Sequence, residues 1–139
     1  MTKSRKTVVE ANEFRIVGKS GKVRAVIGTD DSDNPRIELI NRQGKVQALL
    51  GIGNNGDVRL TLSNYRGQRQ VSVCIQEDFS SGLYLEDENG RARGALTINE
   101  FGTAFINLLD GAEIPRAYTA VDYDGETRVY RRDAATSTV

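Results

Sequence analysis

Residues 37–59 read IELINRQGKVQALLGIGNNGDVR, and the next 23 residues repeat the same pattern as LTLSNYRGQRQVSVCIQEDFSSG. The spacing continues in both directions without an insertion. One row of long polar side chains marks it most clearly, at Arg24, Gln47, Gln70, Arg93 and Arg116. A fixed short period indicates that one supersecondary unit is copied along the chain, and that the copies bury their apolar faces on one another or on a partner.

Two apolar positions lie two residues apart in the first five copies, and the first of them recurs in the partial sixth copy. The first position holds Phe14, Ile37, Leu60, Leu83, Ile106 and Val129, and the second holds Ile16, Leu39, Leu62, Leu85 and Leu108. A second alternating segment follows in each copy, for example Val46-Ala48-Leu50-Ile52. Spacing by two predicts β-strands with one apolar face, so each repeat is expected to contain two strands.

The connections fit hairpins. Residues 41–44, 64–67 and 87–90 place Asn or Asp first and Gly fourth, which is typical of a type I turn closed by a left-handed glycine. The equivalent residues 110–113 lack the closing glycine and are followed by Pro115, so we expect an irregular hairpin there. At the other end of the repeat, tight reversals are indicated by a glycine at one shared position, in Gly56, Gly102 and Gly125.

The sequence therefore predicts an all-β protein, an antiparallel meander of tandem 23-residue β-hairpin repeats with about five and a half copies and about eleven strands. We assign residues 1–12 to a basic N-terminal arm, residues 13–133 to the β-hairpin repeat domain, and residues 134–139 to a flexible C-terminal tail.

Composition argues against an enzyme. The chain has no histidine to activate a nucleophile, and its one cysteine, Cys74, occupies a position that holds small residues in the other copies. The usual His and Cys ligands of zinc and redox metals are missing, so we expect no cofactor and no metal. Nineteen basic and nineteen acidic residues cancel, and nucleic acid is not an expected partner. No apolar run could span a membrane and no hydrophobic signal segment follows the start, so we expect a cytoplasmic protein.

Charge is unevenly distributed between the two ends of the strands. The acidic edge consists of residues 30–35, 53–58, 76–81, 99–104 and 122–127, which hold ten acids and no base. The basic edge consists of residues 18–24, 41–47, 64–70, 87–93 and 110–116, which hold ten bases and four acids, with Lys19, Arg42 and Arg66 as its candidate contact residues. For the acidic edge, the ordinary preference of solvated turns for Asp is as good an explanation as a functional charge pattern. This preference does not explain the basic edge.

The acidic edge also carries a candidate binding site. Its residues are Phe79, Phe101, Tyr123, Asp122 and Asp124. Exposed rings beside carboxylates are suited to stacking on sugars or anchoring a partner, and the carboxylates are oxygen ligands for a cation. As an alternative, the rings fold over the open end of the apolar layer as lids.

The apolar face of the meander must be covered. At about 25 cal/mol per Å², burying its roughly twenty aliphatic side chains represents a gross free-energy gain of tens of kcal/mol. An eleven-stranded barrel would have too wide a lumen, and Arg131 would enter it at the position that leucine holds in earlier copies. We therefore expect a homo-oligomer, preferably a trimer whose three sheets form a prism. A face-to-face dimer and a flattened one-chain sandwich are the alternatives.

These features favour a structural or interaction protein, a self-assembling β-repeat scaffold that is part of a larger particle or filament. The alternative is a carbohydrate- or cation-binding module that uses the acidic, aromatic edge.

Overall fold

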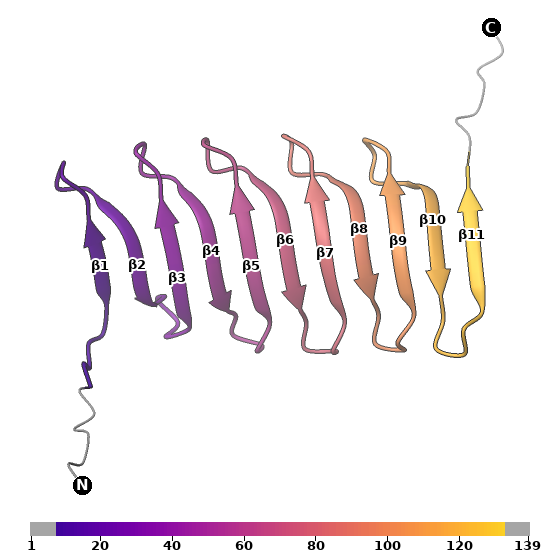
Figure 1. The fold of residues 1–139 in the computed structure, drawn as a ribbon, viewed down its shortest axis with the longest axis horizontal. Helices are drawn as coiled ribbons and strands as arrows, with labels where there is room; N and C mark the ends of the chain where they lie inside the picture. The colour runs from indigo at the N-terminus through magenta and orange to yellow at the C-terminus, as the bar shows by residue number, and fades with distance from the viewer. Residues whose placement is uncertain (1–7, 133–139) are drawn as a thin grey trace, which may run out of the picture.

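A computed structural model of the chain describes residues 8–132 and shows a single open sheet (Figure 1). In this part of the chain, each of the eleven strands pairs with the strands that precede and follow it in sequence. The strands are β1 (Phe14–Val17), β2 (Val23–Thr29), β3 (Pro35–Ile40), β4 (Val46–Ile52), β5 (Val58–Ser63), β6 (Arg69–Ile75), β7 (Ser81–Glu86), β8 (Ala92–Ile98), β9 (Ala104–Leu109), β10 (Pro115–Val121) and β11 (Thr127–Arg131).

The predicted antiparallel meander is therefore confirmed. β1 and β11 lie at opposite ends of the sheet and do not pair with each other (Figure 1). The one-chain sandwich is wrong, because all the described strands belong to one sheet. Most of the predicted N-terminal arm and all of the predicted C-terminal tail lie outside the described residues. No helix among the described residues has the length and hydropathy to cross a membrane.

All ten turns between the strands share one geometry. The first residue donates its amide to the carbonyl of the fifth, as Asn41 does to Lys45 at 2.9 Å, and the fourth donates to the carbonyl of the first, as Gly44 does to Asn41 at 3.1 Å. The fourth residue always has a positive φ, between 60° and 85°. These residues are Gly21, Asp33, Gly44, Gly56, Gly67, Phe79, Gly90, Gly102, Glu113 and Gly125.

The expectation of an irregular fifth hairpin at the basic edge is wrong. Glu113 adopts the left-handed conformation, with φ 60°, and donates its amide to the carbonyl of Asp110 at 3.0 Å as a glycine would. Three hydrogen bonds stabilise this turn. The Asp110 carboxylate accepts the amides of Ala112 and Ile114 at 2.8 and 3.1 Å, and the Glu113 carboxylate accepts the amide of Ala92 at 2.9 Å.

One β-bulge per repeat explains the odd period of 23. Ile40 pairs with Val46 but Leu39 pairs with Ala48, so Gln47 has no partner on β3. The acidic-edge hairpins pair without such a shift. The unpaired residues in the five basic-edge hairpins are Arg24, Gln47, Gln70, Arg93 and Arg116, the same polar row that marks the repeat in the sequence. Because side chains alternate between faces, the extra residue keeps the apolar residues of both strands on one side.

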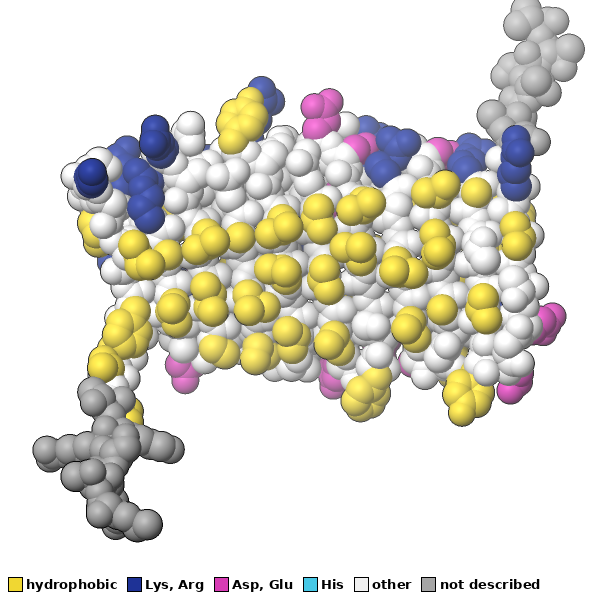
Figure 2. Space-filling model, viewed as in Figure 1, with side chains coloured by type: hydrophobic (Ala, Val, Ile, Leu, Met, Phe, Trp, Pro, Cys, Tyr) yellow, Lys and Arg dark blue, Asp and Glu magenta, His cyan; other side chains and the backbone are white. Residues whose placement is uncertain are grey.

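The two faces of the sheet differ in burial. On the apolar face, which Figure 2 shows, large side chains stand in solvent, and Leu39 and Leu62 are 52 % and 43 % exposed. On the opposite face Val26 and Cys74 are buried, and the rings of Tyr118 and Tyr130 stack with centroids 5.1 Å apart. The side chains of the opposite face therefore pack against one another, whereas the apolar face is left uncovered by the chain.

Candidate interaction surfaces

The apolar face consists of three rows of side chains that cross the sheet perpendicular to the strands (Figure 2). The central row is Phe14, Ile27, Ile37, Leu50, Leu60, Val73, Leu83, Leu96, Ile106, Thr119 and Val129. The row nearer the basic edge is Ile16, Ala25, Leu39, Ala48, Leu62, Val71, Leu85, Gly94, Leu108, Ala117 and Arg131. The row nearer the acidic edge is Thr29, Pro35, Ile52, Val58, Ile75, Ser81, Ile98, Ala104, Val121 and Thr127.

This face is large enough for a stable interface. Eleven strands spaced about 4.8 Å apart cover roughly 1,000 Å² at about 3.3 Å per residue, since β2 to β10 are each six or seven residues long and only β1 and β11 are shorter. A standard protein interface buries about 800 Å² per partner. The largest apolar patch of an ordinary monomer is about 300–600 Å². The uncovered face therefore exceeds what a soluble monomer usually exposes and matches the area of one side of a specific interface.

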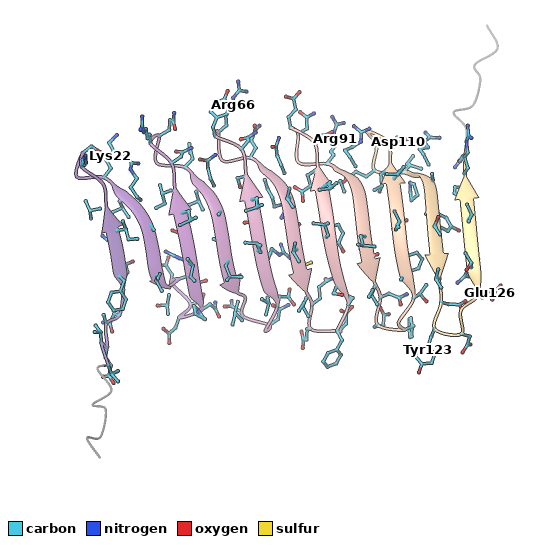
Figure 3. The ribbon with its side chains drawn as sticks, in the orientation of Figure 1. Lys22, Arg66, Arg91, Asp110, Tyr123 and Glu126 are labelled. Carbon is cyan, nitrogen blue, oxygen red and sulfur yellow. The ribbon has the colours of Figure 1, made fainter. Side chains whose placement is uncertain are left out.

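The basic edge is a line of turns joined by side chains. Arg24 Nη1 donates to the carbonyl of Asn41 at 2.6 Å, and Asn41 Nδ2 donates to the carbonyl of Tyr65 at 2.7 Å. Further along the edge, Arg91 Nη1 donates to the carbonyl of Gly111 at 2.8 Å. Figure 3 shows Arg66 and Arg91 on this edge. The links fix successive turns relative to one another, so the edge presents its charges from an ordered framework.

Positive charge is concentrated on the first three basic turns. Residues 18–24, 41–47 and 64–70 hold seven bases and no acid, whereas residues 87–93 and 110–116 hold three bases and four acids. In the latter, arginines form ion pairs within the edge, such as Arg116 Nη2 with the Asp110 carboxylate at 2.5 Å.

The predicted contact residues Lys19, Arg42 and Arg66 are all exposed and belong to the first three turns. Arg66 Nε donates to the hydroxyl of Tyr65 at 2.8 Å, and its guanidinium lies 5.3 Å from the centroid of that ring. Among the described residues, neither Lys19 nor Arg42 forms an ion pair within the chain.

The acidic edge carries three exposed rings. Phe79, Phe101 and Tyr123 are 88 %, 75 % and 87 % exposed, and Tyr123 points away from the sheet in Figure 3. The lid interpretation is therefore wrong, because rings lying over the end of the apolar layer would be covered on one side. They occupy three successive turns, and adjacent repeats are separated by two strand spacings, or about 10 Å.

The predicted carboxylates of this edge have different roles. Asp122 accepts the amide of Glu126 at 2.9 Å and lies 3.5 Å from an Arg128 guanidinium nitrogen, so it helps to build the turn. Asp124 is exposed in the same turn. The described residues contain no group of three or more His, Cys, Asp or Glu side chains that could hold a metal ion.

Hydrogen bonds keep several turn carboxylates ionised into the acid range. The amide of Asn34, with the Asn34 side chain and the amide of Ser32, holds the pKa of Asp30 below its ordinary value. The Ser80 hydroxyl and amide do the same for the pKa of Asp78. Asp30 and Asp78 of the acidic edge therefore keep their negative charge to a lower pH than an ordinary aspartate.

Cys74 and Tyr84 both lie on the packed face. Cys74 is buried, and it pairs across the sheet with Arg59 and Gly82. Burial raises the pKa of the Tyr84 hydroxyl above its ordinary value, so this group stays protonated at neutral pH.

The chain matches no protein-family model, and no curated protein is significantly similar to it in sequence.

Sequence reasoning located the two edges but missed two features of the surfaces. Asp33 and Phe79 occupy the left-handed turn position that glycine holds elsewhere, and neither residue is a turn signal by itself. The burial of Glu86, whose side chain is 5 % exposed and lies 2.8 Å from Arg69 Nε, was also missed. The 23-residue spacing of Phe79 from Gly56 and Gly102 could have revealed the first feature.

Proposed function

We propose that the protein is a structural protein, a self-assembling β-repeat scaffold whose apolar face is buried between copies of the same chain. One observation carries the proposal. Nineteen large apolar side chains of the three rows are 37–77 % exposed, while the opposite face of the same sheet is packed. Such a distribution is the reverse of the usual one, in which an antiparallel sheet turns its apolar face to a core and its polar face to water.

The energetic balance favours assembly. Burying a large aliphatic side chain completely is worth about 1.5–3 kcal/mol, so covering the exposed half of these side chains contributes on the order of 20 kcal/mol per chain. Association costs an estimated 4–15 kcal/mol in lost translational and rotational freedom. The gain exceeds this cost, so identical chains at micromolar concentration should not remain apart.

A pair of neighbouring residues on β9 provides a matched test. Ile106 belongs to the central apolar row and is 57 % exposed, whereas Asn107 points to the opposite face. Ile106→Asp places a charge in the proposed interface and should reduce the native mass or cause aggregation with strong binding of a hydrophobic dye. Asn107→Asp adds the same charge at nearly constant volume and should leave the native mass unchanged. An Ile106→Asp protein with the mass and dye binding of the wild type would overturn the proposal.

A second candidate function is carbohydrate binding at the acidic edge, and the three highly exposed rings favour it. Sugars bind by stacking on aromatic faces beside hydrogen-bonding carboxylates, and a row of rings about 10 Å apart suits an extended chain of sugars. Replacing Phe79, Phe101 and Tyr123 together by alanine should abolish glycan-array binding without loss of stability, because the rings make little contact. If the wild-type protein binds no glycan, this candidate is rejected.

The cation form of this candidate has its own test. Calorimetric titration with Ca²⁺ should show saturable heat in the wild type and a weaker response in Asp124→Asn, if the exposed carboxylates bind the ion. Equal traces for the two proteins would exclude Asp124 as a ligand.

A further inference from the structure

We propose that three chains close into a triangular prism in which the acidic edge of each chain lies against the basic edge of the next. The strands run perpendicular to the threefold axis, and the sheets extend along it. This inference rests on the proposed function, since it requires the apolar faces to meet, and it adds which surfaces lie at the corners and why the assembly stops at three.

The dimensions of the sheet decide the direction of the axis. If the strands form the sides of the triangle, each side is about 23 Å long, and the axis lies about 7 Å from each sheet. Stacked sheets lie about 10 Å apart, so the side chains of one layer fill about 5 Å and nearly reach that axis. If instead the long dimension of the sheet formed the sides, the axis would lie about 14 Å away and the prism would be hollow. Only the first arrangement buries the apolar face.

The sizes of the side chains fit a triangular interior. In a triangle, the space in front of a sheet is deepest at the middle of each side and narrows toward the corners. The central row is large on every strand except β10, where Thr119 stands. The flanking rows interrupt their large residues with small ones, which are Ala25, Ala48, Gly94 and Ala117 on the basic side and Ser81 and Ala104 on the acidic side. A two-sheet sandwich keeps a constant separation and gives no reason for smaller flanking rows.

Threefold symmetry brings opposite charges together. Threefold symmetry about this axis places the acidic end of every strand beside the basic end of a strand in the next chain, at all three corners. Figure 2 shows dark blue side chains, with some magenta ones among them, along one edge and magenta side chains without dark blue along the other. Along an edge, successive turns of either kind are about 10 Å apart, and basic and acidic turns alternate in height by about 5 Å, which is within the Debye length at physiological salt.

Charges available for this contact remain on both edges. Among the described residues, Lys19, Arg42 and Lys45 form no ion pair within the chain, and the same is true of Asp31 and Asp57. Where the basic edge loses net charge, in its last two turns, the acidic edge of the same repeats carries aromatic rings. The acidic turns of these last repeats also hold Glu100, Asp122, Asp124 and Glu126, so the favourable ionic contact is expected near the N-terminal repeats only.

Cross-linking between the edges tests this arrangement. In a Cys74→Ala background, Gln43→Cys on the basic edge and Asn55→Cys on the acidic edge change exposed residues at the third position of their turns. Within one chain, the two sites lie at opposite ends of a strand, about 23 Å apart, which is beyond the reach of a short bismaleimide. Each cross-link between them therefore joins two chains. We expect the double-cysteine protein to give bands of one, two and three chains on a denaturing gel, and none larger.

The controls separate the alternatives. Each single-cysteine protein should give no cross-linked band, and an equimolar reassembled mixture of the two should give only pairs. A ladder that continues beyond three chains would overturn closure in favour of open stacking, and pairs from one single-cysteine protein would overturn the acidic-to-basic contact. The native mass of the untreated protein distinguishes the two failures. A monomeric mass refutes the proposed function as well, whereas an oligomeric mass without edge cross-links refutes only the corner contact.

Discussion

Replacing Leu62 by alanine should weaken association more than it weakens the folded chain. Leu62 belongs to the row nearer the basic edge and is 43 % exposed in the single chain. Its neighbours on the same face are Ala48 and Val71, with which it pairs across the sheet. The chain therefore covers a little more than half of this side chain, and a second copy must cover the remainder.

The magnitude follows from this division. A leucine that is buried completely costs about 2–5 kcal/mol when it is replaced by alanine. If 43 % of that cost belongs to the assembly, each chain loses about 1–2 kcal/mol of association free energy. A trimer contains the substitution three times, so it loses about 3–6 kcal/mol, which raises the dissociation constant about 100- to 10,000-fold.

Sedimentation equilibrium over a dilution series measures this shift, with Thr61→Ala as the control. Thr61 neighbours Leu62 but lies on the packed face, where it pairs with Leu49 and Ser72. Its replacement should change the free energy of unfolding by less than about 1 kcal/mol and leave the dissociation constant unchanged. A Leu62→Ala protein that loses stability with no dependence on concentration would refute the reasoning, because Leu62 would then be covered by its own chain alone.

Three further predictions concern the turns and the bulge. Phe79→Gly should raise the free energy of unfolding by about 0.5–1 kcal/mol in urea, because Phe79 has φ 65° and an exposed ring, whereas Gly56→Ala at the equivalent position should lower it by about 1 kcal/mol. Asp110→Asn should reduce the fall in melting temperature that the wild type shows as the pH is lowered. The amides of Ile114 and Ala112 and the Arg116 guanidinium lower the pKa of Asp110, so the ionised carboxylate stabilises the fold above about pH 4 and this stability is lost as the pH falls through the folded pKa. Deleting Gln47 removes a bulge and should turn the following strands over, which circular dichroism and native mass would report as loss of the folded assembly.

Much of the fold could be predicted because a repeat multiplies weak local signals. A single Asn-x-x-Gly segment is a modest turn signal, but three copies in register, each between alternating apolar segments, fix the lengths of the strands and the direction of the chain. The same register identified the apolar face before any contact was known, since Leu39 and its equivalents recur at a fixed position. Local chemistry and global topology agree at these positions, so sequence reasoning succeeds there.

The remaining features depend on contacts that the pattern does not contain. The sequence shows the row formed by Gln47 and its equivalents. It does not show that these residues form bulges, because that depends on which residues of two neighbouring strands pair with each other. The hairpin that contains Glu113 was expected to be irregular, whereas Glu113 donates its amide to the carbonyl of Asp110 in its own turn and its carboxylate accepts the amide of Ala92. The packed face depends on where long side chains lie, as in the ion pair of Glu86 with Arg69, and alternation alone assigns such residues to solvent.

The sequence predicted where the two charged edges lie, but not the ion pairs within them or the exposure of their aromatic rings. Counting charges along the chain separated the acidic from the basic turns, because each turn kind recurs at one position of the repeat. The count pooled over all five basic turns did not show that the net positive charge lies on the first three, nor that Asp87 and Asp110 form ion pairs with arginines in the last two. It also left open whether the rings of the acidic edge cover the apolar layer, a question that exposure answers.

The native mass of the wild-type protein, measured by light scattering at micromolar concentration, shows whether copies of the same chain cover the apolar face of the sheet. We predict a discrete species of three times the 15.3 kDa chain mass that does not bind a hydrophobic dye. A stable species of 15.3 kDa without dye binding would contradict it, because the exposed leucines and isoleucines of the three rows would then have been buried within a single chain.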